Sequence, residues 1–130
     1  MLDESAPIVV ELAKEFMEFI RCLEPRASHA YFRFEYEELR DRCNGSYVTE
    51  GGATIINAVR HGAFFASMAE KARRLMHAHQ KTRGVFLLII DAQFDYEIRF
   101  DWDNLQRWII TKLNGRTGIP DGLEGVTRPT

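Results

Sequence analysis

The four histidines are the residues with the most obvious capacity for acid–base or metal chemistry. His77 and His79 lie two residues apart in a segment with helical periodicity, and this spacing places their rings on different faces of a helix. They therefore cannot hold a metal ion together from that helix. His61 lies far back in the same segment and His29 begins a predicted strand. We interpret all four as surface or helix-end residues and predict no metal site.

The cysteines and glycines form no catalytic or nucleotide-binding signature either. Cys22 and Cys43 have no metal-like spacing and no histidine partner nearby in the sequence. The pair Gly51-Gly52 lacks the lysine and the strand-to-helix context of a phosphate-binding loop. Acidic strands could supply a carboxylate pair for acid–base catalysis, but no pair stands out. The sequence thus predicts a protein without catalytic residues or cofactor.

The charges of this nearly neutral chain are unevenly distributed. The 130 residues carry a formal net charge of −2, which argues against nucleic-acid binding by bulk electrostatics. Residues 91–104 hold five acids against one arginine, residues 35–41 hold four against one, and residues 60–83 hold six bases against one acid. A solvated face explains any single run, and the basic run suits the end of a helix.

Two acidic runs on strands of one small sheet are harder to explain as solvated faces, because neighbouring like charges destabilise a sheet. A surface that carries such a cost is a candidate binding face for a basic partner. We therefore predict a partner-binding surface for a basic protein that comprises Glu35, Glu37, Asp95, Glu97, Asp101 and Asp103.

Hydrophobic periodicity defines the elements that would position these carboxylates. Residues 5–23 and 58–81 repeat apolar side chains every three or four positions, as amphipathic helices do. Residues 28–38 and 94–102 alternate charged and aromatic or aliphatic side chains, which predicts half-buried strands. Residues 85–91, VFLLIID, are apolar throughout and are typical of a central strand.

Weaker signals fill the gaps between these elements. The Asn-Gly pair in Cys43-Asn44-Gly45 predicts a turn, with a return strand over 46–49 that Gly51-Gly52 interrupts and 53–56 continues. Residues 104–113 are predicted as a third helix, with a strand as the alternative because of the β-branched run there. The tail from about residue 114 is rich in Gly and Pro and predicts loop.

Together these elements predict a single α+β domain over residues 1–130, in the order α-β-β-α-β-β-α, with helices against one face of an antiparallel sheet. The strand 94–102 is expected to bury one row of side chains and leave the other in water. The buried row would be Phe94, Tyr96, Ile98 and Phe100, and the solvated row Asp95, Glu97 and Asp101. The unpaired cysteines, and an N-terminus without the features of a secretion signal, predict a cytoplasmic protein with no membrane partner.

The order of elements resembles the YezG-like immunity proteins of bacterial polymorphic and contact-dependent toxin systems. The resemblance covers most of the chain and rests on the N-terminal helix, AYFRFEY, GVFLLIIDAQFDYEIRFDWDN and RWIITKL, whereas the tail NGRTGIPDGL departs from the family pattern. It implies a small cytoplasmic protein that blocks a cognate toxin domain, often a nuclease, and has no catalytic role. The residues leave two alternatives open. One is a small-molecule-binding or enzymatic domain with a pocket between sheet and helices, completed by loops 41–57 and 114–125. The other is a structural or oligomerisation module.

Overall fold

The computed structural model describes residues 4–38 and 40–123, and within them the chain forms two helices and a five-stranded antiparallel sheet. The predicted α+β class, with helices on one face of an antiparallel sheet, is confirmed. The strands follow the order β3-β2-β1-β4-β5 in the sheet. In chain order the elements are α1 (Ser5–Leu23), β1 (His29–Glu37), β2 (Arg40–Thr49), β3 (Gly52–Ile55), α2 (Gly62–Ala78), β4 (Arg83–Asp91), β5 (Tyr96–Asp101) and a short 3-10 turn, Leu113–Gly115.

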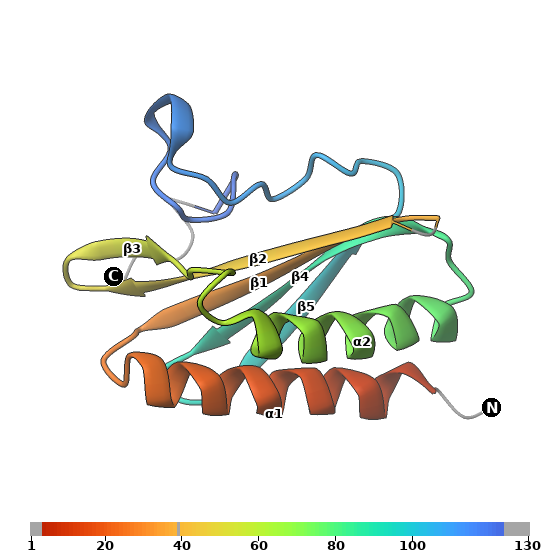
Figure 1. Cartoon of the computed structure of the whole chain (residues 1–130), viewed down its shortest axis with the longest axis horizontal. Coiled ribbons are helices and arrows are strands. Elements are labelled where there is room, and N and C mark those ends of the chain that lie inside the picture. The colour runs from red at the N-terminus through yellow and green to blue at the C-terminus, as the bar shows by residue number, and fades with distance from the viewer. Residues whose placement is uncertain (1–3, 39, 124–130) are drawn as a thin grey trace.

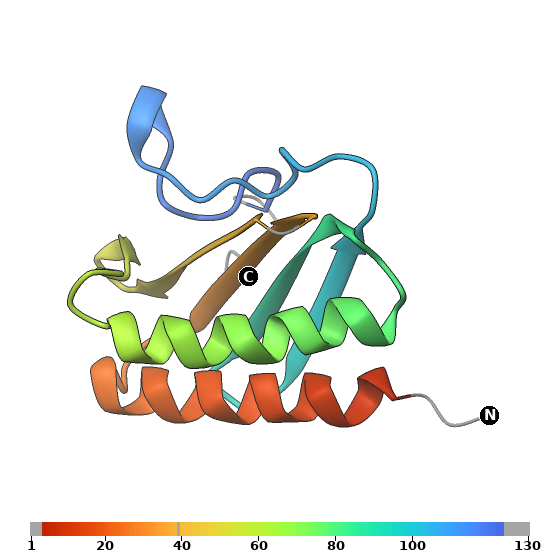
Figure 2. The same cartoon turned by 45° about the vertical axis from the view of Figure 1, so that its right-hand side comes forward.

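The two helices lie side by side and run in opposite directions across the same face of the sheet (Figures 1 and 2). They meet through stacked rings of Phe19 and Phe64, whose centroids are 3.7 Å apart. Aromatic side chains fill the layer between helices and sheet: Phe16, Phe32, Phe34 and Phe86 are all fully buried there. The alternation in β1 is therefore set by this core, which takes every second side chain of the strand.

The opposite face of the sheet, here called the second face, is covered by the C-terminal segment that follows β5 (Figure 1). Leu105, Trp108, Ile110 and Leu123 pack on Tyr31, Val85 and Leu87 and form a second, smaller apolar cluster. This covering explains why β4 is apolar on both sides, as its sequence indicated. Residues 124–130 of the predicted loop tail lie outside the described residues.

The predicted third helix over residues 104–113 is wrong, and so is its strand alternative. Before Leu113–Gly115 the segment consists of a turn at residues 105–108 and irregular backbone at 109–112, and Trp108 has a positive φ of 59°. Its apolar side chains pack on the second face although its backbone is irregular. Such a backbone can be accommodated there because polar side chains of the sheet form hydrogen bonds with it. Asn44 Nδ2, for instance, donates a 3.0 Å hydrogen bond to the carbonyl of Ile110.

The predicted turn at Cys43-Asn44-Gly45 is also wrong, because these residues lie inside β2, opposite residues of β1. The hairpin instead turns between Glu37 and Arg40, with Glu38 at a positive φ of 55°. Gly45 serves close packing: an added Cβ would lie 2.8 Å from the carbonyl oxygen of Tyr31. The Asn-Gly pair is therefore explained by tertiary contacts of the sheet and not by a turn.

The predicted order of elements needs two corrections. A third strand, β3, precedes α2, so three strands stand where the order α-β-β-α-β-β-α has two, and no helix ends the described chain. Glu50 and Gly51 form the turn that separates β2 from β3, and Gly52 is the first residue of β3. Helix α2 begins later than predicted, since Asn57 Oδ1 accepts the backbone N–H groups of Val59 and Arg60 and holds a turn there.

The prediction of which β5 side chains are buried and which are exposed is confirmed for part of the strand. Ile98 and Phe100 pack against the helix-side core, and Asp95 and Glu97 are exposed, as predicted. Phe94 and Tyr96, predicted to be buried, are 51% and 44% exposed, because Phe94 lies in the β4–β5 turn and Tyr96 is the first residue of an edge strand. Asp101 is also not fully in water: its side chain is 17% exposed.

The difference between these two kinds of aromatic residue can be measured. Replacing the fully buried Phe34 by Ala should lower the free energy of unfolding by about 3–5 kcal/mol, because a cavity remains among the surrounding rings. Phe94→Ala should cost less than about 1 kcal/mol, since half of that ring is already in water. Urea unfolding of both variants checks this; equal losses would mean that the core is misassigned.

Candidate partner-binding surface

The six carboxylates predicted to bind a partner lie along one side of the sheet, in β1 and around β5. Glu35 is opposite Val85, and Val85 is opposite Asp101, so both carboxylates project from the second face at the same level. With β4 between them, their backbones are separated by two strand spacings, about 10 Å. Glu97 projects from the same face opposite Ile89. The structure thus brings the two acidic runs together on one face, as the alternation implied.

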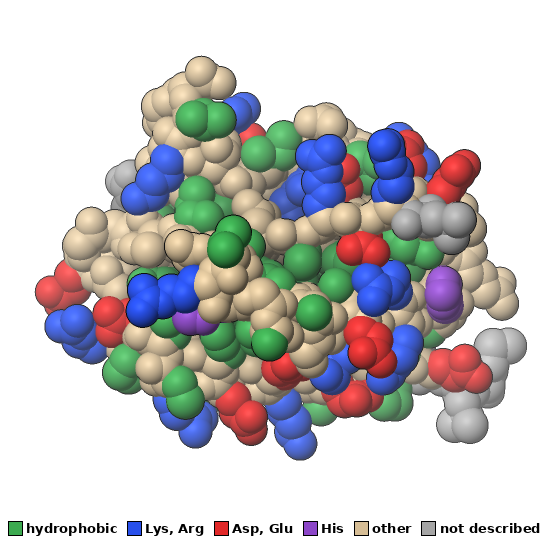
Figure 3. Space-filling model, viewed as in Figure 1, with side chains coloured by type: hydrophobic (Ala, Val, Ile, Leu, Met, Phe, Trp, Pro, Cys, Tyr) green, Lys and Arg blue, Asp and Glu red, His purple; other side chains and the backbone are tan. Residues whose placement is uncertain are grey.

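Arginines stand among these carboxylates and neutralise most of them. Four of the six have an arginine partner, in the pairs Arg33–Glu35, Arg83–Glu37, Arg99–Glu97 and Arg107–Asp101. The face is therefore mixed in charge, where the runs in the sequence indicated a uniformly acidic one. On the other side of the molecule, which Figure 3 shows, basic and acidic side chains are interspersed as well. Arg107 was missed because its segment was expected to form a helix.

Arg33 is the most buried of these arginines. Its Nη1 lies 3.1 Å from Glu35 Oε1, while Nε and Nη2 donate 2.8 Å and 2.6 Å hydrogen bonds to the carbonyls of Arg107 and Leu105. Burial lowers the pKa of Arg33, and the carboxylate of Glu35 opposes that shift. Glu35 is thus needed to neutralise a guanidinium that secures the C-terminal segment.

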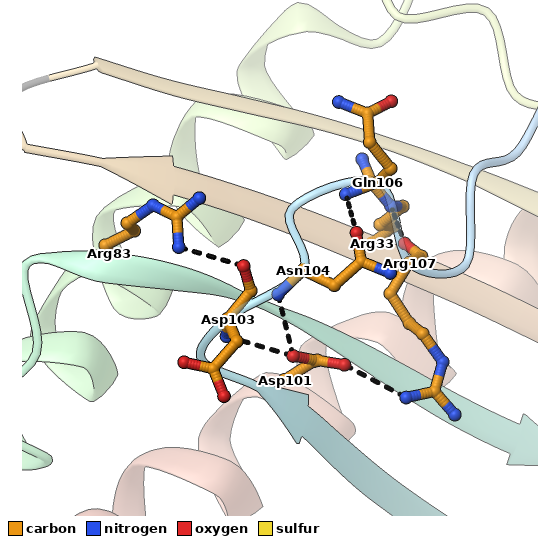
Figure 4. A network of polar contacts seen from close by, with 7 residues as sticks. All are labelled: Arg33, Arg83, Asp101, Asp103, Asn104, Gln106 and Arg107. Carbon is orange, nitrogen blue, oxygen red and sulfur yellow. Dashed lines mark hydrogen bonds and ion pairs between the residues drawn. The ribbon is translucent and has the colours of Figure 1, made fainter.

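Asp101 has a similar role at the end of β5. Its Oδ1 accepts the backbone N–H groups of Asn104 at 2.9 Å and Asp103 at 3.0 Å, and its Oδ2 pairs with Arg107 Nη1 at 3.0 Å (Figure 4). The hydrogen bond from Asn104, then those from Asp103 and Arg107, lower the pKa of Asp101. Its carboxylate therefore organises the turn that leads the chain onto the second face.

Asp95 and Asp103 differ from the other four carboxylates. Both are exposed, and neither side chain has an ion pair or a side-chain hydrogen bond with any residue in the described ranges. The backbone of Asp103 is nevertheless fixed, because its carbonyl accepts a 2.9 Å hydrogen bond from Arg83 (Figure 4). These two carboxylates are available to a partner, at the two ends of β5.

An open cleft of about 290 Å³ lies at the β4–β5 turn, next to Asp95. Three carboxylates border it, against one arginine. Asp91 helps to shape it, since its Oδ1 accepts the backbone N–H groups of Gln93 and Asp95 at 2.8 Å and 3.1 Å. The cleft is the most acidic part of this surface and is lined by His29, Ile89, Ile90, Asp91, Asp95, Tyr96, Glu97, Arg99 and Leu123.

The histidines and cysteines are not part of this surface, apart from His29 at the cleft. Within the described part of the chain, no group of three His, Cys, Asp or Glu side chains is placed to hold a metal ion. His77 is exposed, whereas His79 is half-buried against Phe100 and Trp102. Burial raises the pKa of the Cys43 thiol to about 11, while Cys22 is exposed on α1.

Neither comparison with known sequences links the chain to a known group: no family model matches it, and no curated protein is significantly similar to it. None of the helices in the described ranges has the length and apolar character that crossing a membrane requires. The surface around β5 therefore has to be interpreted from its own geometry.

The two thiols should differ in reactivity, because only a thiolate attacks an alkylating agent rapidly. At pH 8 the native protein should take up one iodoacetamide group, at Cys22, while Cys43 stays protonated and shielded. Both should react after denaturation. Peptide mass spectrometry measures the two sites separately, and rapid native labelling of Cys43 would contradict the burial of β2 against the helices.

The lowered pKa of Asp101 links its interactions to pH. Such a group stabilises the fold fully above its unfolded pKa of about 3.9, and this stabilisation is lost as the pH falls through the lower folded value. Asp101→Asn should therefore unfold at a lower temperature than the wild type at pH 7, and the difference should shrink below about pH 4. Asp95→Asn is the control, and a pH-independent difference would refute this role of the Asp101 charge.

Proposed function

We propose that this protein is an immunity protein, which binds a cognate bacterial toxin domain, a nuclease, and covers its active site. The observation that supports this most directly is the pair of unengaged, exposed carboxylates, Asp95 and Asp103, at the two ends of β5. The resemblance to YezG-like immunity proteins supplies the class of partner. The protein is proposed to act by binding alone and to have no enzymatic activity.

The chemistry of a nuclease fits such a surface. A nuclease must hold phosphate groups, so its active site is lined by cations, and carboxylates placed there compete with the nucleic acid. Asp95 extends the acidic cleft toward solvent, so a basic loop of the toxin would meet Asp91, Asp95 and Glu97 together. Exposed charges of this kind mainly accelerate association and select the partner.

The six predicted residues then divide into two groups by role. Asp95, Glu97 and Asp103 are exposed and are proposed to contact the toxin. Glu35 and Asp101 hold the C-terminal segment on the sheet, so their contribution to binding would be to maintain the conformation of the surface. Glu37 is as exposed as Glu97 and lies 3.7 Å from Arg83, so it belongs with the residues proposed to contact the toxin.

The alternative function, a small-molecule or enzymatic domain with a pocket between sheet and helices, has less support. In the described ranges the aromatic core occupies that layer, and Phe16, Phe32, Phe34 and Phe86 there are fully buried. A ligand would have to displace these rings at a cost of several kcal/mol each. We therefore favour a function carried by the surface of the protein.

The test uses the C-terminal domain of the protein encoded immediately upstream of this chain as the toxin partner. Asp95→Lys/Asp103→Lys should slow association with that domain by about tenfold or more and reduce the salt dependence of the rate. Neither side chain forms a hydrogen bond or an ion pair with another described residue, so the variant should unfold at nearly the wild-type temperature. Stopped-flow fluorescence across ionic strength measures the rates.

The matched control is Glu50→Lys/Glu70→Lys, which makes the same change in net charge at exposed positions in the β2–β3 turn and on α2. Its association rate should stay close to that of the wild type. Equal slowing by both variants would show a non-specific effect of net charge and contradict the assignment of the surface. If the upstream domain does not inhibit growth, or if this chain does not relieve the inhibition, the proposed function itself is wrong.

A further inference from the structure

Strand β5 forms one edge of the sheet and pairs on one side only, with β4. Among the described residues, no backbone hydrogen bond reaches its outer side. Every second residue of such an edge presents an unpaired N–H and C=O, which is a template for another strand. The opposite edge, β3, is shorter, with four residues, and the C-terminal segment approaches it at Gly118.

Exposed apolar side chains gather beside this edge. Phe94, Tyr96 and Val10 are three of the five large hydrophobic residues described as exposed. Val10 lies on the same flank of α1 as Met17 and Arg21, and the Arg21 guanidinium is 4.6 Å from the centre of the Phe94 ring. The other flank of α1 packs on α2. The β5 edge and the free flank of α1 therefore make one continuous surface of the kind that binds a protein.

We propose that this surface binds a second copy of the same chain, with the two β5 strands paired antiparallel about a two-fold axis at Ile98. An axis perpendicular to the sheet keeps each face on its own side, so opposite residues must project from the same face. In this register Glu97 is opposite Arg99 of the second copy, twice over, and Tyr96 is opposite Phe100. Both kinds of cross-strand pair stabilise a sheet.

The neighbouring registers are less complementary. Pairing centred on Arg99 would place two arginines against each other and Glu97 against Asp101. Pairing centred on Phe100 would place Arg99 against Asp101, whose carboxylate Arg107 already holds, and would bring Glu97 against Asp103. Only residues 99–101 of β5 would then lie opposite one another, whereas the Ile98 register pairs residues 96–100. In the Ile98 register like charges meet only where Asp95 is opposite Asp101, which also occurs twice, and Arg107 already neutralises Asp101.

In the isolated chain Arg99 and Glu97 satisfy each other, with Nε 2.6 Å from Oε2, but they are 35% and 56% exposed and free to exchange partners. In the dimer the two α1 helices would approach across the axis and cover Val10 and Met17. The result would be a continuous ten-stranded sheet, which leaves the acidic clefts accessible on the second face. This inference goes beyond toxin binding and does not depend on it.

Charge reversal tests the register through the mass of the full chain in solution. The wild type should sediment as a dimer of twice 15.1 kDa at tens of micromolar. Glu97→Arg and Arg99→Glu should each weaken the dimer at least tenfold, since each creates like-charge pairs. Mixed in equal amounts, the two variants should form a heterodimer, because both pairs between positions 97 and 99 then join an arginine to a glutamate. The double variant Glu97→Arg/Arg99→Glu should also dimerise.

Glu70→Arg, on the far side of the molecule, is the control and should remain dimeric, and thermal unfolding should show that all variants are folded. A wild type that is monomeric at millimolar concentration would overturn the proposal. So would single variants that stay dimeric, or two monomeric variants that do not associate when mixed. Each single variant loses the Glu97–Arg99 contact within its own strand, so association of the mixed variants can come only from pairing between the two chains. The toxin-binding variant Asp95→Lys/Asp103→Lys should keep its dimer, so the two proposals fail independently.

Discussion

The arrangement of the second face depends on the buried guanidinium of Arg33. A charged group is costly to bury unless it is paired and fully hydrogen-bonded. Arg33 meets this condition through Glu35 and two carbonyls of the C-terminal segment, those of Leu105 and Arg107. The segment that carries those carbonyls has no regular structure, so its own backbone groups need partners as well. The two requirements are met by the same contacts, and this explains how an irregular segment can cover a sheet.

The same contacts determine the charge of the surface. Once the segment lies across the second face, Arg107 reaches Asp101 and Arg83 reaches the backbone of Asp103. Glu37 meets Arg83 independently of the segment, because the two residues are opposite each other in β1 and β4. Carboxylates that form an uninterrupted acidic run in the sequence thereby become half of a mixed network. The two carboxylates that stay without a side-chain partner among the described residues, Asp95 and Asp103, lie at the two ends of β5. The contacts that hold the segment on the sheet therefore also decide that Asp101, between them, is neutralised.

The sequence was sufficient for the features that depend on local periodicity. The ends of α1, the alternation in β1 and the apolar character of β4 follow from which side chains meet one core, and each was predicted. The errors concern segments whose conformation is set by distant contacts. Gly45 is small because Tyr31 lies close behind it, and residues 104–113 follow the sheet because Arg33 and Asn44 bind their carbonyls. A prediction from the residues of a short segment cannot take such long-range contacts into account. It therefore gave a turn at Gly45 and a helix at residues 104–113.

The candidate surface shows the same division. Alternation placed Glu35, Glu97 and Asp101 on one face correctly, and it placed Arg33 and Arg99 there as well, each two residues from its partner glutamate. It could not reveal Arg107 and Arg83, which reach Asp101 and Glu37 from other segments. It also could not reveal that β5 ends the sheet, since edge position is a property of topology. The edge position nevertheless determines what the strand can bind. A strand with alternating charges and unpaired backbone groups accepts a second strand only in a register that brings opposite charges together. Aromatic residues on one face supply contact area, and charges on the other exclude the registers in which like charges meet. The strictly alternating sequence of β5 therefore encodes both how the strand packs in its own sheet and which strand it can accept beside it.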